Sequence, residues 1–191
     1  MSSHDITHIL TRTVEALSEP ESLKGLFHQH SDGYPLPSGK ALEEIIDLSR
    51  SILFPGYFGK SSVNMHTIRY HIGVNTERLF KLLTDQIMAG LSFGCGDHDE
   101  MDIPKDVCRE KASAIAAELI ARLPAIRHTL GTDVVAAYNG DPAADNYGEI
   151  ISCYPVIKAL TNYRVAHELD VLGVPLIPRI MTEMAHSETG I

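Results

Sequence analysis

Apolar residues recur at intervals of three to four positions along most of the chain. This spacing is typical of amphipathic helices, whose buried side repeats about every 3.6 residues. We find no run that alternates apolar and polar residues between two turn signals, which is the pattern of a half-buried strand. The pattern therefore predicts an all-α fold, an irregular bundle of several helices.

Turn residues divide this pattern into segments. One weak helix is expected at residues 4–17, and a loop rich in Ser, Gly and Pro follows it. Ser38 can cap the next helix, which ends at the Pro and Gly residues of "FPGYFG". We therefore divide the chain into a leader, residues 1–35, and a helical domain, residues 36–191. Further helices are expected at residues 62–91, from Asp102 and Pro104 to the stretch "LGTD", at residues 134–138, from Pro155 to Gly173, and from about Ile177 to Gly190.

Two of these helices have apolar faces that the sequence identifies. In the helix that begins near Pro104, Cys108 falls on the apolar face, so we interpret it as a small core residue rather than a reactive thiol. In the helix that begins at Pro155, the expected stripe includes His167. The connector before it, "DPAADNYGEIISCYP", is predicted to contain a helical turn or two. The faces are Cys108, Ala112, Ile115, Leu119 and Leu123 in the first helix, and Val156, Leu160, Tyr163 and His167 in the second.

Charge and composition narrow the class of protein. The chain has 16 Lys and Arg residues against 25 Asp and Glu residues, a formal net charge of −9. This balance disfavours nucleic-acid and anionic-membrane partners, which need a basic face. No apolar run approaches the length of a bilayer span, and the N-terminus, "MSSHDITHIL", lacks the pattern of a secretory signal. With only three scattered cysteines, a reduced, cytoplasmic protein is expected.

The ten histidines suggest a metal site, but their spacing does not support one. None of the local groups has the spacing of a metalloprotease helix or a zinc finger, and none supplies a full ligand set. The acidic loop "GCGDHDEMD" lacks the glycine and the distal glutamate of a calcium-binding loop. We interpret all of them as solvated loop residues and expect no metal. The groups considered are His28 with His30, His66 with His71, Cys95 with His98, and Asp97, Asp99, Glu100 and Asp102.

Two residues are candidates for a functional role. Asp141 precedes Pro142, and this pair alone is a frequent helix start, with Asp as the N-cap and Pro at the first helical position. His167 lies one turn beyond Tyr163 on the expected apolar stripe. For His167, a buried histidine satisfied by a neighbouring hydroxyl or carbonyl group is favoured over a catalytic one. No phosphate-binding glycine loop or nucleophile elbow is present.

Several longer motifs together resemble one family. They are "DVVAAYNGDPA", "EIISCYP", "YRVAHEL" and "PLIPRIMTEMAHSETGI", with "LPSGKALEEIIDLSRSILFPGYFG" upstream. From Leu36 onward the chain resembles the N-terminal helical domain of bacterial serine O-acetyltransferase, in the form of the family with a longer leader. One departure is Val156, which stands where the family usually has glycine after "CYP".

The resemblance implies a fold and an activity. In the family, "SETGI" leads into a left-handed parallel β-helix of hexapeptide repeats, so this chain is expected to stop before that domain. The family transfers the acetyl group of acetyl-CoA to L-serine for cysteine synthesis, with a histidine as general base and an aspartate that orients it. Both residues, and most of the CoA site, belong to the β-helix. The resemblance therefore implies no catalytic, cofactor-binding or metal residue in this chain.

One substrate-binding residue carries over. The aspartate of the "GDPA" motif, Asp141, is implied to hold the ammonium group of serine, and His167 remains a candidate supporting residue. Acetyl-CoA is expected as a cosubstrate of the full-length enzyme, with no tightly bound cofactor. The 191-residue chain is expected to be inactive alone.

The family also implies partners. A homo-oligomer is expected, a trimer or a dimer of trimers, and the alternative to an enzyme is a non-catalytic helical oligomerisation or interaction module. Family members commonly end in an isoleucine that enters O-acetylserine sulfhydrylase. The sulfhydrylase is therefore a further candidate partner. Here, however, Gly190 and Ile191 match the domain junction in register. Coincidence is therefore favoured over a docking role for Ile191.

Overall fold

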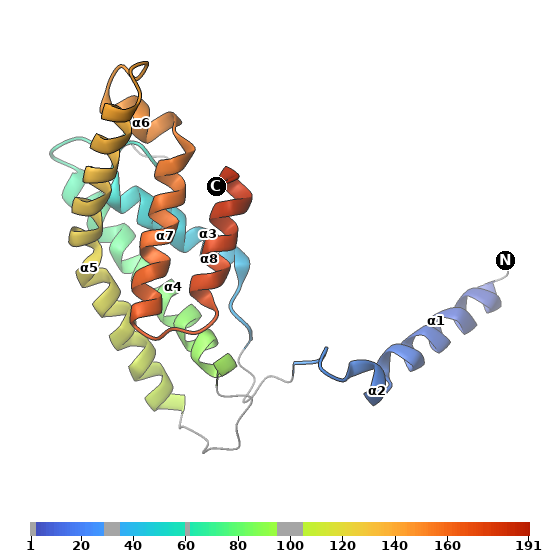
Figure 1. Ribbon diagram of the computed structural model, residues 1–191. Helices are drawn as coiled ribbons and strands as arrows, with labels where there is room; N and C mark the ends of the chain where they lie inside the picture. Colours follow the sequence, from blue (N-terminus) through green and yellow to red (C-terminus); the bar gives the residue numbers. More distant parts are fainter. Residues whose placement is uncertain (1–2, 29–34, 60–61, 95–104) are drawn as a thin grey trace. The chain divides into compact units, whose positions relative to one another are not determined.

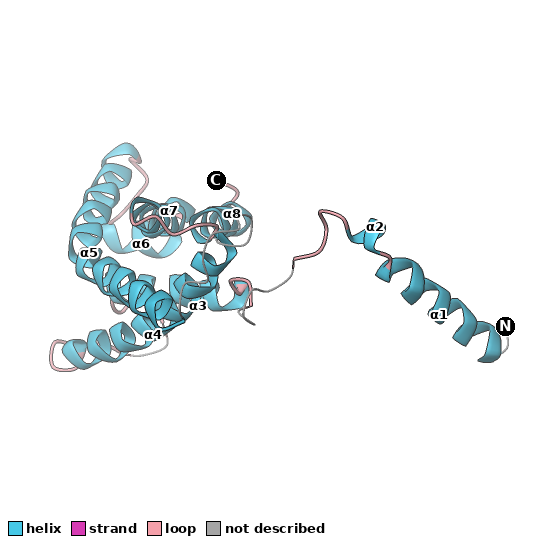
Figure 2. Cartoon of the chain, turned by 90° about the horizontal axis from the view of Figure 1, so that it is seen from below, coloured by secondary structure: helices cyan, strands magenta, loops and turns pink. Residues whose placement is uncertain are grey.

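The computed structural model describes residues 3–28, 35–59, 62–94 and 105–191. These residues form eight helices and no strand, which confirms the predicted all-α fold (Figures 1 and 2). None of the helices in these four ranges has the length and apolar character needed to cross a membrane. The helices are α1 (Ser3–Ser18), α2 (Pro20–Leu23), α3 (Gly39–Leu53), α4 (Ile68–Gly94), α5 (Lys105–Gly140), α6 (Tyr147–Cys153), α7 (Pro155–Val171) and α8 (Ile177–Thr189).

The chain divides into two compact units, Met1–Gly33 and Tyr34–Ile191. The first unit contains α1 and α2, and α1 agrees with the helix predicted at residues 4–17. The division into a leader of residues 1–35 and a helical domain of residues 36–191 stays a prediction. The apolar side chains of α1 are exposed along its length, and they are Ile6, Ile9, Leu10, Val14 and Leu17.

The second unit contains one hydrophobic core to which each of its helices contributes. Helix α4 packs against α3 and α5, and α7 packs against α8, beside which it lies in both views (Figures 1 and 2). Each large apolar side chain that is fully buried contributes about 1.5–3 kcal/mol to folding. The largest of them are Leu42, Ile45, Leu79, Leu83, Ile87, Leu119, Leu130, Ile150, Ile157, Leu169, Ile177 and Met181.

Two predicted helix ends are confirmed. The hydroxyl oxygen of Ser38 accepts a hydrogen bond from the backbone N–H of Ala41 at 3.3 Å, as an N-cap of α3 should. Helix α8 ends at Gly190, which has a φ of 73° in the left-handed region. Glycine adopts this conformation without the strain that a Cβ atom would introduce.

Helix α4 begins later than predicted, at Ile68 rather than residue 62. The side-chain oxygen of Asn64 accepts hydrogen bonds from the backbone N–H groups of His66 at 2.9 Å and Thr67 at 3.2 Å. Asparagine competes in this way with the helical backbone pattern and so favours a turn. The apolar period does not reveal this local competition.

Helix α5 is continuous to Gly140, so the prediction of a separate short helix at residues 134–138 is wrong. A proline in a helix interior costs about 3 kcal/mol relative to alanine, and Pro124 lies inside α5. The helix continues because its buried stripe continues through the proline, and the burial of these side chains outweighs that cost. The start predicted at Asp102 and Pro104 lies outside the described residues. The stripe consists of Leu123, Ile126, Leu130 and Val134.

Helix α7 buries a different face from the predicted one. The predicted stripe is half-buried at Val156 and Leu160 and exposed at Tyr163 and His167. Apolar residues lie on two sides of this helix, and the period alone does not indicate which side faces the core. The connector before α7 contains α6, which confirms the expected helical turns. The buried face of α7 includes Ile157, Thr161, Val165 and Leu169.

Candidate functional site

Asp141 lies in a turn directly after α5, at the end of the bundle where α6 and α7 begin (Figure 1). Its Oδ1 atom accepts a hydrogen bond from the backbone N–H of Ala143 at 2.9 Å, and its carbonyl oxygen accepts one from the N–H of Ala144 at 3.1 Å. No helix begins at Pro142, so the interpretation of Asp141 as an N-cap is wrong. Asn146 caps α6 instead, through a 3.0 Å hydrogen bond from the N–H of Glu149.

The other carboxylate oxygen of Asp141, Oδ2, accepts a hydrogen bond from the hydroxyl group of Tyr154. Tyr154 lies at the junction of α6 and α7, and its backbone is extended, with φ −82° and ψ 120°. Pro155 favours this conformation because the proline ring excludes helical geometry from the preceding residue. The backbone N–H of Tyr154 also donates to the carbonyl oxygen of Ile150 at 3.2 Å. The junction therefore fixes the tyrosine that binds Asp141.

These hydrogen bonds change the acidity of both groups. Donation by Tyr154, followed by donation from the backbone of Ala143, lowers the pKa of Asp141 below its ordinary value of 3.8. The same contact with a carboxylate raises the pKa of Tyr154 to about 12. At neutral pH the site therefore contains a half-buried, negatively charged carboxylate and a neutral phenol.

Close packing holds the turn around Asp141 in place. The rings of Tyr138 and Tyr147 meet edge to face with their centroids 4.8 Å apart, which joins the end of α5 to the start of α6. At Gly148, a Cβ atom would lie 3.2 Å from the hydroxyl group of Tyr57 and 3.0 Å from the side-chain oxygen of Asn146. Only a residue without a side chain fits there without displacing a neighbour.

The structure does not bring His167 into this site. His167 is exposed on α7, and its ring stacks on that of Tyr163 with the centroids 5.9 Å apart and the planes 16° from parallel. The interpretation of His167 as a buried histidine satisfied by a hydroxyl or carbonyl group is therefore wrong. Among the described residues, the side chain of Asp141 contacts Tyr154 and Ala143 rather than His167.

The candidate metal ligands do not assemble in the described part of the chain. There, no group of three or more His, Cys, Asp or Glu residues could hold a metal ion. One histidine of the set, His71, instead lies with its Nε2 atom 3.0 Å from the hydroxyl oxygen of Ser51 and 3.1 Å from the amide nitrogen of Asn75. His30, Cys95, His98 and the acidic loop lie outside the described residues.

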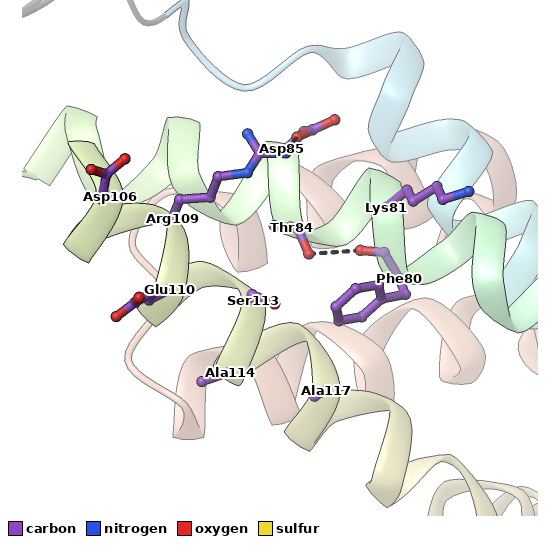
Figure 3. Close-up of a pocket in the computed structure, with 10 residues that line it drawn as sticks. All are labelled: Phe80, Lys81, Thr84, Asp85, Asp106, Arg109, Glu110, Ser113, Ala114 and Ala117. Atoms are coloured by element: carbon purple, nitrogen blue, oxygen red, sulfur yellow. Dashed lines mark hydrogen bonds and ion pairs between the residues drawn. The ribbon is translucent and has the colours of Figure 1, made fainter.

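A cavity of about 980 Å³ lies between α4 and α5, and Asp141 is not among the residues that line it (Figure 3). The ring of Phe80 faces small residues of α5, among them Ser113 and Ala117, and charged side chains surround them. Arg109 of α5 and Asp85 of α4 approach to 3.7 Å. The described part of this lining therefore combines an ion pair with small side chains and an aromatic ring.

Sequence reasoning missed the role of Tyr154. It placed this residue in a connector and gave it no function. The available signal was the Tyr–Pro pair at a helix junction, since proline restricts the residue before it. The partner of that tyrosine could not be identified, because Asp141 lies on the other side of α6.

Comparison with known proteins identifies relatives of the chain. It is 40% identical over 183 residues to a serine acetyltransferase encoded on a plasmid of Synechococcus elongatus, a match that covers 95% of this chain and 57% of the relative. A shorter match, 41% identical over 64 residues, covers 34% of this chain and 26% of a serine acetyltransferase from Synechocystis. A search of protein-family models gave no match.

Solved structures give the same result. Serine acetyltransferase 1 of Entamoeba histolytica, crystallised in complex with L-cysteine, matches with a TM-score of 0.60 and 28% identity. This match covers 93% of this chain and 56% of that protein. The native form of the same enzyme also matches with a TM-score of 0.60, at 30% identity. The chain is therefore related to the serine acetyltransferases, as its motifs indicate, and spans a little more than half the length of these relatives.

Proposed function

We propose that the protein is a serine O-acetyltransferase of cysteine biosynthesis and that these 191 residues supply its helical, serine-holding part. In this reaction the hydroxyl oxygen of L-serine attacks the thioester carbonyl carbon of acetyl-CoA. The new ester bond forms as the carbon–sulfur bond breaks, and CoA leaves as its thiol while a general base takes the hydroxyl proton. The family resemblance implies that this base and most of the CoA site belong to a β-helix domain rather than to these helices.

The charge of Asp141 is the observation that supports a role in binding serine. Its pKa is lowered by neutral donors, the hydroxyl group of Tyr154 and the backbone of Ala143. Among the described residues it forms no ion pair. An ammonium group placed against this half-buried carboxylate would gain a charge-assisted hydrogen bond. In this proposal Tyr154 positions Asp141 and leaves its negative charge available to the substrate.

A chimaera tests the activity. Residues 1–191 are joined to the part of the Synechococcus relative that the match does not reach, and O-acetylserine formation from acetyl-CoA and L-serine is measured. We expect acetyl transfer by the chimaera and none by the 191-residue polypeptide. A folded chimaera without activity, or O-acetylserine formation by the 191 residues alone, contradicts the proposal.

The same chimaera tests Asp141. Asp141→Asn removes the charge that would bind the ammonium group, so we expect the KM for serine to rise about tenfold or more, with a smaller change in kcat. The matched control is Asp145→Asn, because Asp145 is an exposed carboxylate of the same turn. Equal serine KM values for the two variants would exclude the proposed role of Asp141.

An association module is the second candidate function, and two large hydrophobic side chains that are exposed on α7 favour it. Tyr163 is 51% exposed and Val171 is 58% exposed. A homo-oligomer, a trimer or a dimer of trimers, would cover these side chains. Light scattering after size exclusion tests this, and a monomer at all concentrations contradicts it.

Binding of O-acetylserine sulfhydrylase through Ile191 is tested by deletion of that residue, and binding that survives the deletion excludes the terminal isoleucine as the contact.

A further inference from the structure

Two histidines of α1, His4 and His8, lie four residues apart in the stretch "HDITH". Residues at this spacing are neighbours on one face of a helix, with their Cβ atoms about 5–6 Å apart. The two zinc-binding histidines of the H-E-x-x-H motif have the same spacing on a helix. Sequence reasoning did not consider this pair, which has the geometry of a metal chelate.

Both histidines border one hollow on the surface of α1. The residues that line it are His4, Thr7, His8 and Thr11. The hydroxyl group of Thr11 donates to the carbonyl oxygen of Thr7 at 3.0 Å, so its proton is directed to the helix backbone. The imidazole nitrogens are therefore the strongest metal ligands in this lining. Because both histidines are exposed, an ion reaches them from solvent without a rearrangement of the fold.

A pair of imidazole groups holds an ion when water completes its coordination, as water does at catalytic zinc sites. This agrees with the described ranges, which contain no group of three or more His, Cys, Asp or Glu residues that could hold a metal ion. Imidazole suits Zn²⁺, Cu²⁺ and Ni²⁺, whereas Mg²⁺ and Ca²⁺ prefer oxygen ligands. The positive end of the helix dipole opposes a cation in the first turns, and the acidic residue there, Asp5, reduces this opposition.

Helix α1 has little stability of its own. Each residue from His4 to Ser18 is exposed, so no buried side chain of this range holds the helix in place. Isolated helices shorter than about 12–15 residues are marginal in water, and α1 has only 16 residues. An extended chain would separate His4 from His8 by about 13 Å, too far for one ion to bind both. An ion that binds both therefore favours the helical state.

The apolar side of α1 stays uncovered when such an ion is bound. At 3.6 residues per turn, His4 and His8 lie on the side of the helix opposite Ile6, Leu10 and Leu17. These three side chains share one face only while the chain is helical. Metal binding on one side would therefore keep the apolar face on the other side assembled.

We propose that His4 and His8 form a chelating site for a transition-metal ion that imidazole favours, such as Zn²⁺, and that the bound ion holds α1 in its helical form. The site lies in the first compact unit and does not depend on the proposed acetyl transfer.

A zinc titration of the 191-residue chain, first stripped of metal with EDTA, tests the pairing. Imidazole nitrogen signals in long-range ¹H–¹⁵N spectra report on each histidine separately. We expect His4 and His8 to respond with one shared Kd, at least about tenfold lower than that of His128. His128 is an exposed residue of α5 with no other histidine or cysteine within four positions. Different Kd values for His4 and His8, or a shared value no lower than that of His128, overturn the proposal.

An exchange of two residues tests the spacing at constant composition. His8→Thr together with Thr11→His keeps both histidines on one face of α1 but places them two turns, about 10 Å, apart. The zinc affinity measured at His4 should then fall at least about tenfold, to that of a lone histidine. The control His128→Gln should leave it unchanged. An exchange variant that binds zinc at His4 as tightly as the wild-type chain contradicts chelation by the pair.

Amide hydrogen exchange tests the effect on the helix. At a zinc concentration a hundred times the Kd, exchange within α1 should slow at least about tenfold in the wild-type chain, because the ion binds the helical state. The exchange variant should show no such change. If both histidines bind zinc and exchange in α1 stays equally fast, the proposed stabilisation of the helix is wrong.

Discussion

The carboxylates of Asp141 and Glu188 both have lowered pKa values, but the groups that lower them differ in charge. Asp141 is stabilised by a phenol and a backbone amide, both neutral, whereas Glu188 is stabilised by the cations Arg50 and Lys158. The charge of Glu188 is therefore paired with cations of the chain itself, and the charge of Asp141 is not. A low pKa alone does not distinguish a structural carboxylate from one available to a ligand, but the identity of the donors does.

Removal of the charge at Glu188 should have the largest effect on stability. Glu188→Gln removes the nearest charged partner of the buried guanidinium group of Arg50, and the loss of such a partner usually costs about 3–5 kcal/mol at a fully buried pair. Because the side chain of Glu188 is 36% exposed, we expect a loss of about 2 kcal/mol in the free energy of unfolding, measured by urea denaturation. Glu183→Gln is the matched control, because Glu183 is an exposed glutamate of the same helix, α8. Its free energy of unfolding should stay within about 0.5 kcal/mol of the wild-type value. Equal values for both variants would mean that Arg50 does not need Glu188.

The dependence of stability on pH should follow from the same pair. The pKa of Glu188 in the folded protein lies below its ordinary value of 4.5. The contribution of ionised Glu188 to the free energy of unfolding is therefore complete above pH 4.5, and it is lost as the pH falls through the pKa of the folded protein. We therefore expect acid to reduce the difference in unfolding free energy between the wild-type protein and Glu188→Gln. A difference that persists unchanged at low pH would exclude ionisation of Glu188 as its cause.

The smallest effect is expected at Tyr154. Tyr154→Phe removes the main cause of the lowered pKa of Asp141, which should then rise towards 3.8, as followed by ¹³C NMR of the carboxyl group. The phenol signal lost in this variant should be the one that titrates near pH 12 in absorbance measurements. Tyr163→Phe, on the exposed face of α7, is the control and should leave Asp141 unchanged. An unchanged Asp141 pKa in Tyr154→Phe would show that the hydrogen bond does not hold the carboxylate ionised.

Local signals in the sequence predicted the parts of the fold that depend on single residues. The hydroxyl group of Ser38 caps α3, and Gly190 ends α8, because these functions need only one side chain or one backbone conformation. The all-α class followed from the repeated apolar period. These features require no knowledge of what packs against them.

Features that depend on tertiary packing were missed or wrong. The continuity of α5 past Pro124 depends on neighbours that bury its stripe, and the buried face of α7 depends on where α8 lies. The wrong prediction that His167 is buried followed from the wrong choice of the buried face of α7. For the candidate site, the resemblance indicated Asp141, but its pairing with Tyr154 across α6 is a contact between distant positions, and single-sequence patterns do not report such contacts.

The length of α5 has a mechanical consequence. With 36 residues and a rise of about 1.5 Å per residue, it is a rod of about 54 Å whose last residue, Gly140, directly precedes Asp141. A small tilt at the Lys105 end becomes a larger sideways displacement at the other end, as in a lever. Pro124 lacks one backbone hydrogen bond near the middle of this rod, so the lever bends most easily there.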